Sequence, residues 1–274
     1  MHTRLFTLPV FHLFGHDVGP FVLHTYGVIL AVGFLAGLFV AAWQARKAGL
    51  DAARVSDLAV YVLIAGLLGA KLMLLAIDWP TYSRMSAREI LLAFLQSGGV
   101  FYGGLVGGLA MALWFARRSE LPLWPTADVL APGVVIGQSI GRLGCFAAGC
   151  CWGKTASVPW AVTFTDVEVA RTIGTPIDTP LHPSQIYESL LTLVIFVVLI
   201  WLAPRKKFHG QVALTYVVLY SITRFSLEFY RGDAGRGFFG PLSTSQWVAV
   251  VLLLTAAAVF PRLRKARVVT PAAA

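Results

Sequence analysis

The sequence predicts an all-α polytopic membrane helix bundle of seven transmembrane helices, with the N-terminus outside and the C-terminus in the cytoplasm. Three observations predict it. Of the 274 residues, 57% are hydrophobic and only 13% are charged, whereas soluble domains carry about 25% charged residues. Seven stretches approach the roughly 20 apolar residues that a bilayer-spanning helix needs. The basic residues are also unevenly shared among the segments between these stretches, which indicates the orientation.

The seven predicted spans form a single integral membrane domain over residues 1–274. They are 22–44, 57–77, 99–116, 127–150, 185–203, 211–230 and 245–260. The third and seventh spans are short and need their apolar flanks to cross a bilayer. Residues 86–97 are amphipathic and typical of a helix in the membrane interface. The only sizeable loop, 151–184, is expected at the outer face.

The orientation follows from sorting the 22 basic residues by segment. Twelve lie after the first, third, fifth and seventh spans: Arg46, Lys47, Arg54, Arg117, Arg118, Arg205, Lys206, Lys207, Arg262, Arg264, Lys265 and Arg267. Seven lie at the N-terminus or after the other spans: Arg4, Arg84, Arg88, Lys154, Arg171, Arg231 and Arg236. Because basic residues favour the cytoplasm, the net charge of +9 reflects topology. No nucleic-acid partner is expected.

The remaining three basic residues, Lys71, Arg142 and Arg224, fall inside predicted spans. At a rise of about 1.5 Å per residue, each lies roughly 20 Å from the cytoplasmic end of its helix. All three therefore reach a similar depth in the outer half of the membrane. Tyr26, Tyr102 and Glu188 belong to helices that start at the outer face and reach the same layer. A charge at this depth is costly without a partner or a function.

Two interpretations of these cations stay open. In a structural one, Lys71, Arg142 and Arg224 pair with Glu188, Glu228 and Asp128, or extend to the interface. In a functional one, they form a site for an anionic ligand, since the planar guanidinium group suits phosphate. The sixth span favours the functional interpretation. Its polar residues share one helix face at spacings of four, four and three: Tyr220, Arg224, Glu228 and Arg231.

Small residues recur at four-residue spacing in the third and fourth spans. The fourth carries Gly133, Gly137 and Gly141, and the third carries Gly103 with Gly107 and Gly104 with Gly108. Such spacing lets membrane helices approach closely. Packing is therefore the main interpretation of these glycines, and some of them also make room for a ligand.

The three cysteines, Cys145, Cys150 and Cys151, lie within seven residues at the outer end of the fourth span. They are interpreted as structural thiols or as one disulfide. Three sulfurs with His182 are an alternative zinc set, although the spacing lacks a CxxC pair. A membrane thiol oxidoreductase and a transporter remain alternative functions, but no two-fold repeat supports a transporter. A non-catalytic scaffold would not need the arginines at matched depth.

Several short motifs, in order along the chain, resemble the signature of the prolipoprotein diacylglyceryl transferase family. They are Tyr26-Gly27, Gly66-x-x-Gly69-Ala70-Lys71-Leu72, Ala127-Asp128 with Ala131-Pro132, Gly137, Gly141-Arg142-Leu143-Gly144-Cys145-Phe146 with Gly149 and Trp152-Gly153, His182-Pro183-Ser184-Gln185-Ile186-Tyr187-Glu188, and Tyr220 with Arg224-Phe225, Glu228-Phe229 and Arg231. The resemblance is colinear from about residue 20 to residue 260. Each motif is short, but their order makes the set specific.

The resemblance implies an enzyme of the bacterial inner (cytoplasmic) membrane. It would transfer the diacylglyceryl group of phosphatidylglycerol to the lipobox cysteine thiol of a preprolipoprotein signal peptide, forming a thioether and releasing glycerol phosphate. The partners would be these two substrates and membrane lipid, with no cofactor or metal. The implied catalytic residues are Arg142, Arg224, Tyr102 and Glu228. The implied substrate-binding residues are Tyr26, Lys71, Gly103, Gly104, Cys145, Gly153, His182, Tyr187, Glu188, Tyr220 and Arg231.

The chain departs from the family pattern at four of these positions. Tyr102 stands where a histidine is usual, Cys145 where asparagine is usual, Cys150 where glutamate is usual, and Lys71 where arginine is usual. A base is needed because the thiolate is the nucleophile. Tyr102 can serve only if nearby cations favour its deprotonation, and His24 and His182 are alternative bases. A family member with a different acceptor is therefore an alternative.

Overall fold

The computed structural model describes residues 4–8, 11–13, 16–18, 21–96, 99–233 and 237–265. Two basic residues used for the orientation, Arg236 and Arg267, lie outside them. The chain divides into two compact units. Unit 1 comprises Met1–Val40 and Ala127–Ala274, and unit 2 comprises Ala41–Thr126.

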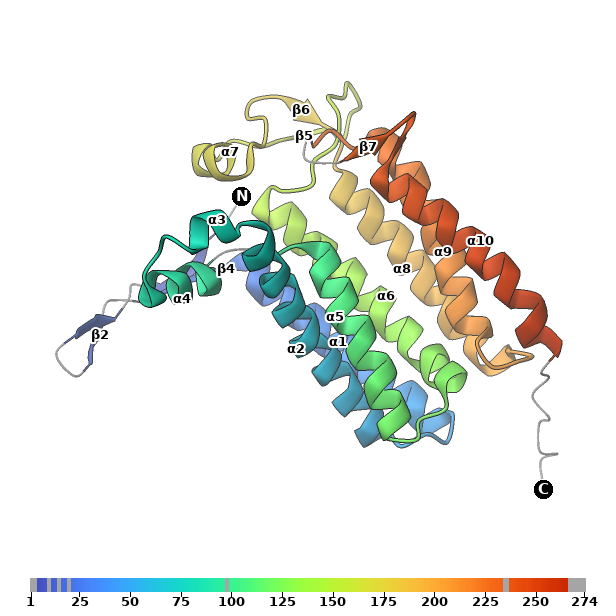
Figure 1. Cartoon of the computed structure of the whole chain (residues 1–274). Helices are drawn as coiled ribbons and strands as arrows, with labels where there is room; N and C mark the ends of the chain where they lie inside the picture. The colour runs from blue at the N-terminus through green and yellow to red at the C-terminus, as the bar shows by residue number, and fades with distance from the viewer. Residues whose placement is uncertain are drawn as a thin grey trace. The chain divides into compact units, whose positions relative to one another are not determined.

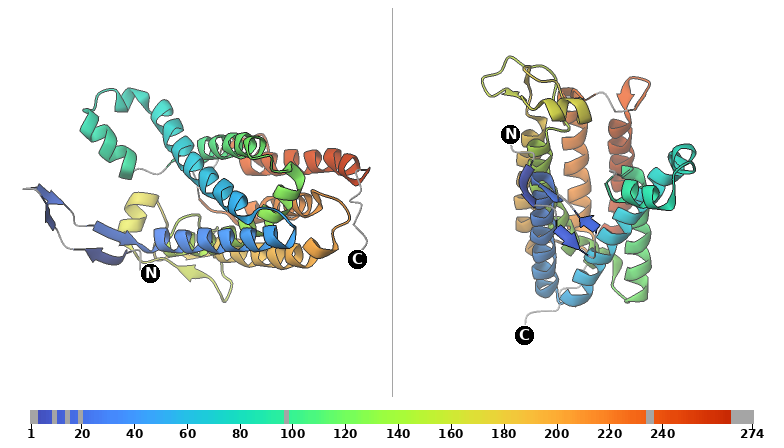
Figure 2. Two further views of the ribbon diagram at one scale, coloured as in Figure 1. Left: turned by 90° about the horizontal axis from the view of Figure 1, so that it is seen from below. Right: turned by 90° about the vertical axis from the view of Figure 1, so that its left-hand side faces the viewer.

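Unit 1 is built mainly from long helices. They are α6 (Leu123–Ala148, from residue 127 on), α8 (Ser184–Leu202), α9 (Gln211–Leu227), α10 (Thr244–Lys265) and the part of α1 (Thr25–Lys47) before residue 41. Two short 3-10 helices, η1 (Ala203–Arg205) and η2 (Glu228–Tyr230), follow α8 and α9. Helix α9 packs against both α8 and α10, and the three lie side by side in Figure 1 and in the views of Figure 2.

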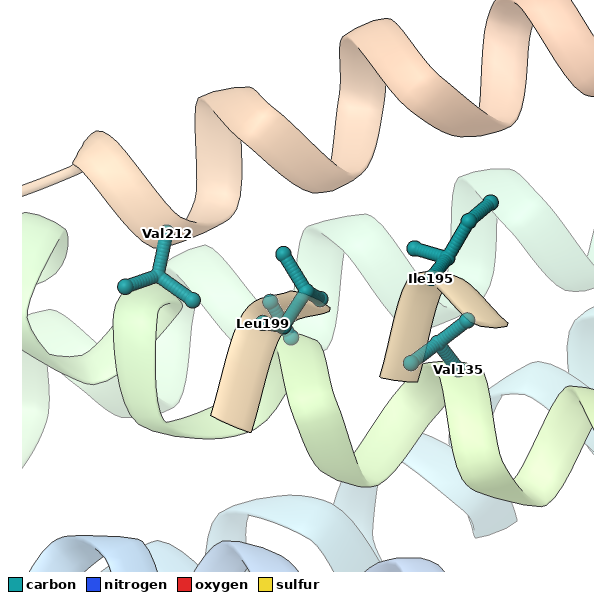
Figure 3. Packing of buried hydrophobic residues seen from close by; sticks show 5 residues of the cluster. Val135, Ile195, Leu199 and Val212 are labelled. Atoms are coloured by element: carbon teal, nitrogen blue, oxygen red, sulfur yellow. The ribbon is translucent and has the colours of Figure 1, made fainter. Parts of the chain in front are cut away.

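The apolar core of unit 1 lies where α6, α8 and α9 meet. Val135 of α6, Ile195 and Leu199 of α8 and Val212 of α9 are all buried in one cluster (Figure 3). Lipid tails are as apolar as these side chains, so close packing and polar pairs must stabilise helix association here. Such a pair joins α6 to α8. The Ser139 hydroxyl donates to the Ser189 carbonyl oxygen at 2.8 Å, and the Ser189 hydroxyl donates to the Ser139 carbonyl oxygen at 2.9 Å.

Glycines bring α1 and α6 into backbone contact. A Cβ atom added at Gly37 would lie 2.6 Å from the Gly133 carbonyl oxygen, and one added at Gly33 would lie 3.0 Å from that of Gly137. No larger residue fits at Gly37 without moving a helix. The four-residue spacing of Gly133 and Gly137 therefore serves packing, as the sequence predicted.

A buried carboxylate holds the start of α9. Asp128 of α6 accepts hydrogen bonds from the backbone N–H groups of Gly210 and Ala213, at 2.8 and 3.0 Å. It also pairs with Lys206 at 2.8 Å. The N-terminus of a helix carries unsatisfied N–H groups and a partial positive charge. Asp128 is therefore a structural residue whose partner is Lys206. The structural interpretation of the sequence, which paired Asp128 with a basic residue inside a predicted span, is wrong for this residue.

The predicted loop 151–184 contains regular structure that the sequence analysis did not predict. Strands β5 (Val162–Thr163) and β6 (Pro180–Leu181) pair antiparallel, and α7 (Val167–Ile173) lies between them in the chain. Trp152, Phe164 and Leu181 form a small buried cluster. Asp166 caps α7, which ends at Gly174 in the left-handed conformation. The segment therefore has a small core of its own.

Short strands also occur near both ends of the chain. At the N-terminus, β1 (Arg4–Leu8) pairs antiparallel with β4 (Phe21–His24), and β2 (Phe11–Leu13) pairs with β3 (His16–Val18). Before α10, β7 (Phe238–Phe239) pairs with β8 (Leu242–Ser243). The sequence analysis predicted none of these strands, because each is too short for an alternating pattern to stand out.

Unit 2 is formed by α2 (Ala52–Ile77), α3 (Trp79–Tyr82), α4 (Ala87–Gln96) and α5 (Phe101–Arg118). Helices α2 and α5 pack along their length through small residues. A Cβ atom added at Gly69 would meet the carbonyl oxygen of Gly103 and lie 3.2 Å from the Cα atom of Gly107. The amphipathic stretch 86–97 corresponds to α4, over the part of it that the structure describes.

The helices account for the predicted spans with small shifts at their ends. Six described helices are long and apolar enough to cross a membrane: α1, α2, α6, α8 with η1, α9 with η2, and α10. The third predicted span coincides with α5, but this helix of 18 residues ends in Arg117 and Arg118 and is not among the six. Many large apolar side chains are exposed, among them Leu35, Phe39 and Leu254. These helices are those of a multi-pass membrane protein.

Candidate functional site

Three helices of unit 1 bring Arg142, Glu188 and Tyr220 together. The Arg142 guanidinium on α6 pairs with Glu188 on α8 at 2.9 Å. The Tyr220 hydroxyl on α9 lies 3.3 Å from the same carboxylate oxygen of Glu188. The Glu188 side chain is 2% exposed, whereas that of Arg142 is 19% exposed. The carboxylate is therefore enclosed, and the guanidinium retains access to the surroundings.

A second ion pair lies one turn further along α9. Arg224 pairs with Glu228 at 3.0 Å, four residues on, and donates a hydrogen bond to the Ser245 hydroxyl of α10 at 2.9 Å. Tyr220 interacts electrostatically with both Arg142 and Arg224. Tyr220 of α9 therefore lies within electrostatic range of two guanidinium groups, which come from separate helices. Glu228 orients Arg224, in agreement with the ion pairing that the structural interpretation of the sequence allowed.

Arg231 lies beyond the helix on which the sequence spacing placed it, and its guanidinium binds Asp233. It follows η2 in extended conformation, and its guanidinium makes two hydrogen bonds to Asp233, at 2.8 and 2.6 Å. Burial opposes the positive charge, but the hydrogen bonds and charge of Asp233 raise the pKa of Arg231 above its usual value. The expectation that Arg231 continues the face of Tyr220 and Arg224 is wrong in this respect, because the α-helix ends at Leu227.

The backbone of Arg231 lies against Gly153, with which it forms an isolated antiparallel bridge. A Cβ atom at Gly153 would lie 2.7 Å from the Cβ atom of His182 and 2.9 Å from the carbonyl oxygen of Tyr230. The Gly153 N–H donates to the His182 carbonyl at 3.1 Å. Gly153 is therefore the point where three chain segments cross, and only glycine fits there.

His182 and Tyr187 belong to an aromatic group at the start of α8. His182 Nδ1 lies 3.1 Å from the Tyr187 hydroxyl, to which the Trp160 indole N–H donates at 2.6 Å. The rings of His182 and Tyr230 meet edge to face, with their centroids 5.4 Å apart. The His182 backbone N–H also donates to the Lys154 carbonyl at 2.9 Å. These contacts hold the loop 151–184 against the start of α8.

The three cysteines converge at the end of α6. Cys145, Cys150 and Cys151 are free thiols, and their sulfur atoms lie within 4.8 Å of one another. Hydrogen bonds from the thiols of Cys145 and Cys150, together with the charges of Arg231 and Arg142, lower the pKa of Cys151. Of the two states that the sequence left open, thiols or one disulfide, the structure shows thiols. Among the described residues the group comprises the cysteines alone, without the His182 of the alternative zinc set.

Tyr26 lies beside this thiol group. It interacts electrostatically with the three cysteines and with Arg142. A Cβ atom at Gly144 would lie 3.3 Å from the Tyr26 ring, so this glycine of α6 makes room for the tyrosine of α1. Tyr26 is 40% exposed. Tyr26 is therefore a partly exposed residue close to Arg142.

Lys71, Tyr102, Gly103 and Gly104 lie in unit 2. Lys71 donates to the Phe94 carbonyl oxygen, and its ammonium group lies 5.1 Å from the centre of the Phe94 ring. Tyr102 is 47% exposed at the start of α5. Gly103 and Gly104 face α2: a Cβ atom at Gly104 would lie 3.2 Å from the Gly66 carbonyl oxygen. Both glycines therefore pack helices, whatever else they do.

Three further residues that the sequence did not predict hold this site. Asp233 binds Arg231, Ser245 binds Arg224, and the Gln185 amide nitrogen donates to the Cys150 carbonyl at 2.7 Å. Gln185 lies inside the motif 182–188, and Asp233 stands two residues after Arg231, so both were within reach of sequence reasoning. Ser245 comes from another helix, and no pattern in the sequence links it to Arg224.

This arrangement suits recognition of an anion. Each of the two arginines gives part of its guanidinium group to a buried carboxylate, yet the group has five N–H donors in a fixed plane. The carboxylates orient the arginines, and the remaining donors suit the oxygens of a phosphate group. The polar residues of the site therefore match an anionic, phosphate-containing ligand at the edge of an apolar helix bundle.

Comparison with known proteins agrees with this chemistry. The sequence pattern of the family described as "Prolipoprotein diacylglyceryl transferase" matches residues 14–261. A protein of Clostridium tetani named phosphatidylglycerol--prolipoprotein diacylglyceryl transferase is 31% identical over 258 residues, covering 93% of this chain and 98% of its own length. Proteins with the same name from Synechococcus elongatus and Methylobacillus flagellatus are 31% and 32% identical. They cover 86% and 90% of this chain, and 82% and 94% of their own lengths.

The matches extend across the long helices of both units, including all the residues of the candidate site. They confirm the resemblance seen in the sequence, and they do not favour a different acceptor, a thiol oxidoreductase or a transporter. By its sequence pattern and by its curated relatives, this chain belongs to the prolipoprotein diacylglyceryl transferase family.

Proposed function

We propose that this chain transfers the diacylglyceryl group of phosphatidylglycerol to the lipobox cysteine thiol of a preprolipoprotein signal peptide. The thiolate sulfur attacks the glycerol carbon that carries the phosphate ester. A carbon–sulfur bond forms, the carbon–oxygen bond breaks, and glycerol phosphate leaves with the electron pair. The proton of the thiol passes to a base of the site. Membership of the family supports the reaction, and the arginines support its substrate class.

The observation that carries the proposal is that the guanidinium groups of Arg142 and Arg224 are each paired with a buried carboxylate in unit 1. As the carbon–oxygen bond breaks, negative charge grows on the phosphate oxygen. Fixed donors in a water-poor site are the strongest means of stabilising such charge. Because Glu188 and Glu228 hold the two arginines before substrate arrives, little reorganisation is needed during the reaction.

The other proposed residues have supporting roles. Tyr26 and Tyr220 donate hydrogen bonds to the head group, and Tyr102 takes the proton of the acceptor thiol. Glu228 positions Arg224. The remaining proposed substrate contacts are Lys71, Gly103, Gly104, Cys145, Gly153, His182, Tyr187, Glu188 and Arg231.

We further propose how the chain crosses the membrane. The chain forms one membrane domain with seven spans in the bacterial inner membrane, α5 being the additional span. Its N-terminus lies outside and its C-terminus in the cytoplasm. The excess of basic residues after the odd-numbered spans supports this orientation. The site then lies in the outer half of the bilayer, where both a phospholipid head group and a secreted lipobox peptide reach it.

A defined assay tests the reaction. Purified protein in phosphatidylglycerol vesicles receives a lipobox peptide, and glycerol phosphate release is measured together with the mass of the peptide. We expect equal amounts of glycerol phosphate and of peptide heavier by one diacylglyceryl group. A peptide with serine in place of the cysteine serves as the control and should yield neither. Release from the serine peptide, or no transfer when a relative is active in the same vesicles, would contradict the proposal.

A further inference from the structure

The three thiols at the end of α6 form a compact group of soft ligands. Cys145 belongs to the last turns of α6, whereas Cys150 and Cys151 follow the helix, yet all three sulfur atoms lie within 4.8 Å of one another. Three sulfurs bound to one ion at about 2.3 Å stand roughly 4 Å apart. Small rotations about the Cα–Cβ bonds therefore suffice to bring these thiols around a single ion.

The backbone that carries the thiols is held in an unusual conformation. Cys151 has a φ angle of 62° and Gly149 one of 73°, so the chain turns back on itself within three residues. A non-glycine residue rarely adopts this left-handed conformation, and it persists where neighbouring contacts impose it. Here the Ser184 hydroxyl donates to the Cys151 carbonyl at 2.8 Å, and Gln185 donates to that of Cys150. Residues at the start of α8 therefore hold the thiols together.

Two arginines place positive charge near the thiols. Both Arg231 and Arg142 interact electrostatically with Cys151, and Arg142 also interacts with Cys145. Three thiolates around a monovalent ion carry two net negative charges. The guanidinium groups partly offset this charge, and each is also paired with a carboxylate, Arg142 with Glu188 and Arg231 with Asp233.

We propose that Cys145, Cys150 and Cys151 form a three-coordinate site for a soft monovalent metal ion, and that the ion is Cu(I). Soft thiolates select Cu(I) and zinc. Structural zinc sites take four ligands, whereas the group contains three in the described part of the chain. His182 does not belong to this group of ligand atoms. Cu(I), with a filled d shell, accepts three sulfur ligands in a plane.

Binding to the full-length protein tests this site without reference to transfer activity. The detergent-purified protein is reduced, freed of reductant without oxygen and titrated with Cu(I) against a coloured Cu(I) chelator. We expect one Cu(I) per chain and a thiolate-to-copper absorption band in the near ultraviolet. X-ray absorption at the copper edge should show three sulfur neighbours. Since this measurement uses the wild-type protein, it does not depend on whether a variant folds.

Variants then assign the ligands. Because loss of an outer-shell partner of a metal ligand typically costs about 10–100-fold in affinity, each single change Cys145→Ser, Cys150→Ser or Cys151→Ser should weaken binding by at least roughly 100-fold. Met111→Leu removes a soft sulfur outside the group and should bind like the wild type. Thermal unfolding and gel filtration identify variants that do not fold.

Four outcomes would overturn the site. They are three titratable thiols that retain no Cu(I), a disulfide that resists reduction, oxygen or nitrogen neighbours at the copper edge, and a Cys145→Ser variant that binds as tightly as the wild type. Zinc that binds more tightly than Cu(I), with the same dependence on the cysteines, would overturn the three-coordinate assignment.

Discussion

Unit 1 and unit 2 both pack helices through glycines, but they differ in the charge that they bury. Unit 1 buries the charged groups of Asp128, Glu188, Glu228 and Arg231. Among the described residues of unit 2, no charged side chain is buried, and α2 meets α5 through glycines such as Gly69. Buried charge is costly in a membrane and so indicates a function or a specific structural role. Small residues give close backbone packing at little cost. Among the described residues, the buried charges that the proposed reaction uses therefore lie in unit 1.

The largest expected effect concerns catalysis in unit 1. Changing Arg142 to alanine should lower the rate of glycerol phosphate release by about 10²–10³-fold, because one preorganised donor to the growing charge is lost. Arg142→Lys keeps the charge but not the planar donors, and it should restore only part of the rate. The initial rate with the lipobox peptide is the measurement.

Arg205→Ala is the matched control for Arg142→Ala. Arg205 is exposed and donates to the Trp201 carbonyl at 2.9 Å, far along α8 from Glu188. Its loss should leave the rate unchanged. If Arg142→Ala keeps a rate close to that of Arg205→Ala, the phosphate-binding role of Arg142 is wrong.

Asp128 separates the structural charges of unit 1 from the catalytic ones. Asp128→Ala leaves Lys206 and two backbone N–H groups of α9 without their shared acceptor. Removing one partner of a buried ion pair costs about 3–5 kcal/mol. We expect the free energy of unfolding to fall by that amount, while the rate per folded molecule stays unchanged. Denaturant unfolding in detergent and the transfer assay measure the two quantities.

Asp51→Ala provides the corresponding change in unit 2. Asp51 caps α2 by accepting from the N–H groups of Ala53 and Arg54, and it is exposed. Loss of an exposed cap costs about 1 kcal/mol. Equal losses of stability for the two aspartates would show that burial of charge does not distinguish the units.

Two glycines on one helix test the packing of unit 2. Gly69→Ala places a methyl group against the carbonyl oxygen of Gly103, so α2 and α5 must separate. We expect a loss of about 1–3 kcal/mol, as for an overpacked core. Gly66→Ala, three residues earlier, meets only the Gly104 carbonyl oxygen at 3.5 Å, an ordinary contact.

The Gly66 variant should gain stability, because alanine favours a helix by up to about 1 kcal/mol over glycine. Thermal unfolding of both variants in the same detergent is the measurement. A change of the same sign and size at both positions would contradict close packing at Gly69.

The smallest expected effect lies in α4. The N–H and hydroxyl groups of Ser86 donate to Glu89 at 2.7 and 2.8 Å, and these hydrogen bonds lower the pKa of Glu89. A lowered carboxyl pKa stabilises the folded state above the usual pKa, and this contribution disappears as the pH falls through the lowered value. At neutral pH the wild type should therefore have a slightly higher midpoint temperature of thermal unfolding than the Glu89→Gln variant. The two midpoints should converge in acid, and a gap that persists there would exclude the carboxylate as its source.

Much of this architecture was predictable from the sequence, because a membrane helix needs a long apolar stretch whatever surrounds it. All seven predicted spans coincide with helices, and Arg142, Arg224, Glu188 and Tyr220 were identified as buried polar groups. The short strands and α7 were not predicted. Their stability comes from contacts such as that between Phe164 and Trp152, which are distant in sequence and leave no local periodicity.

The sequence by itself determined that the chain is a membrane helix bundle with costly charges in its spans. It also determined the family, since the motifs occur in one order. Only the tertiary structure decided which charge meets which: Glu188 with Arg142, Lys206 with Asp128, and Asp233 with Arg231. It also brought three thiols together. The reason is physical. Apolar length is a local property of the chain, whereas the partner of a buried charge depends on which helices pack together and at which turn.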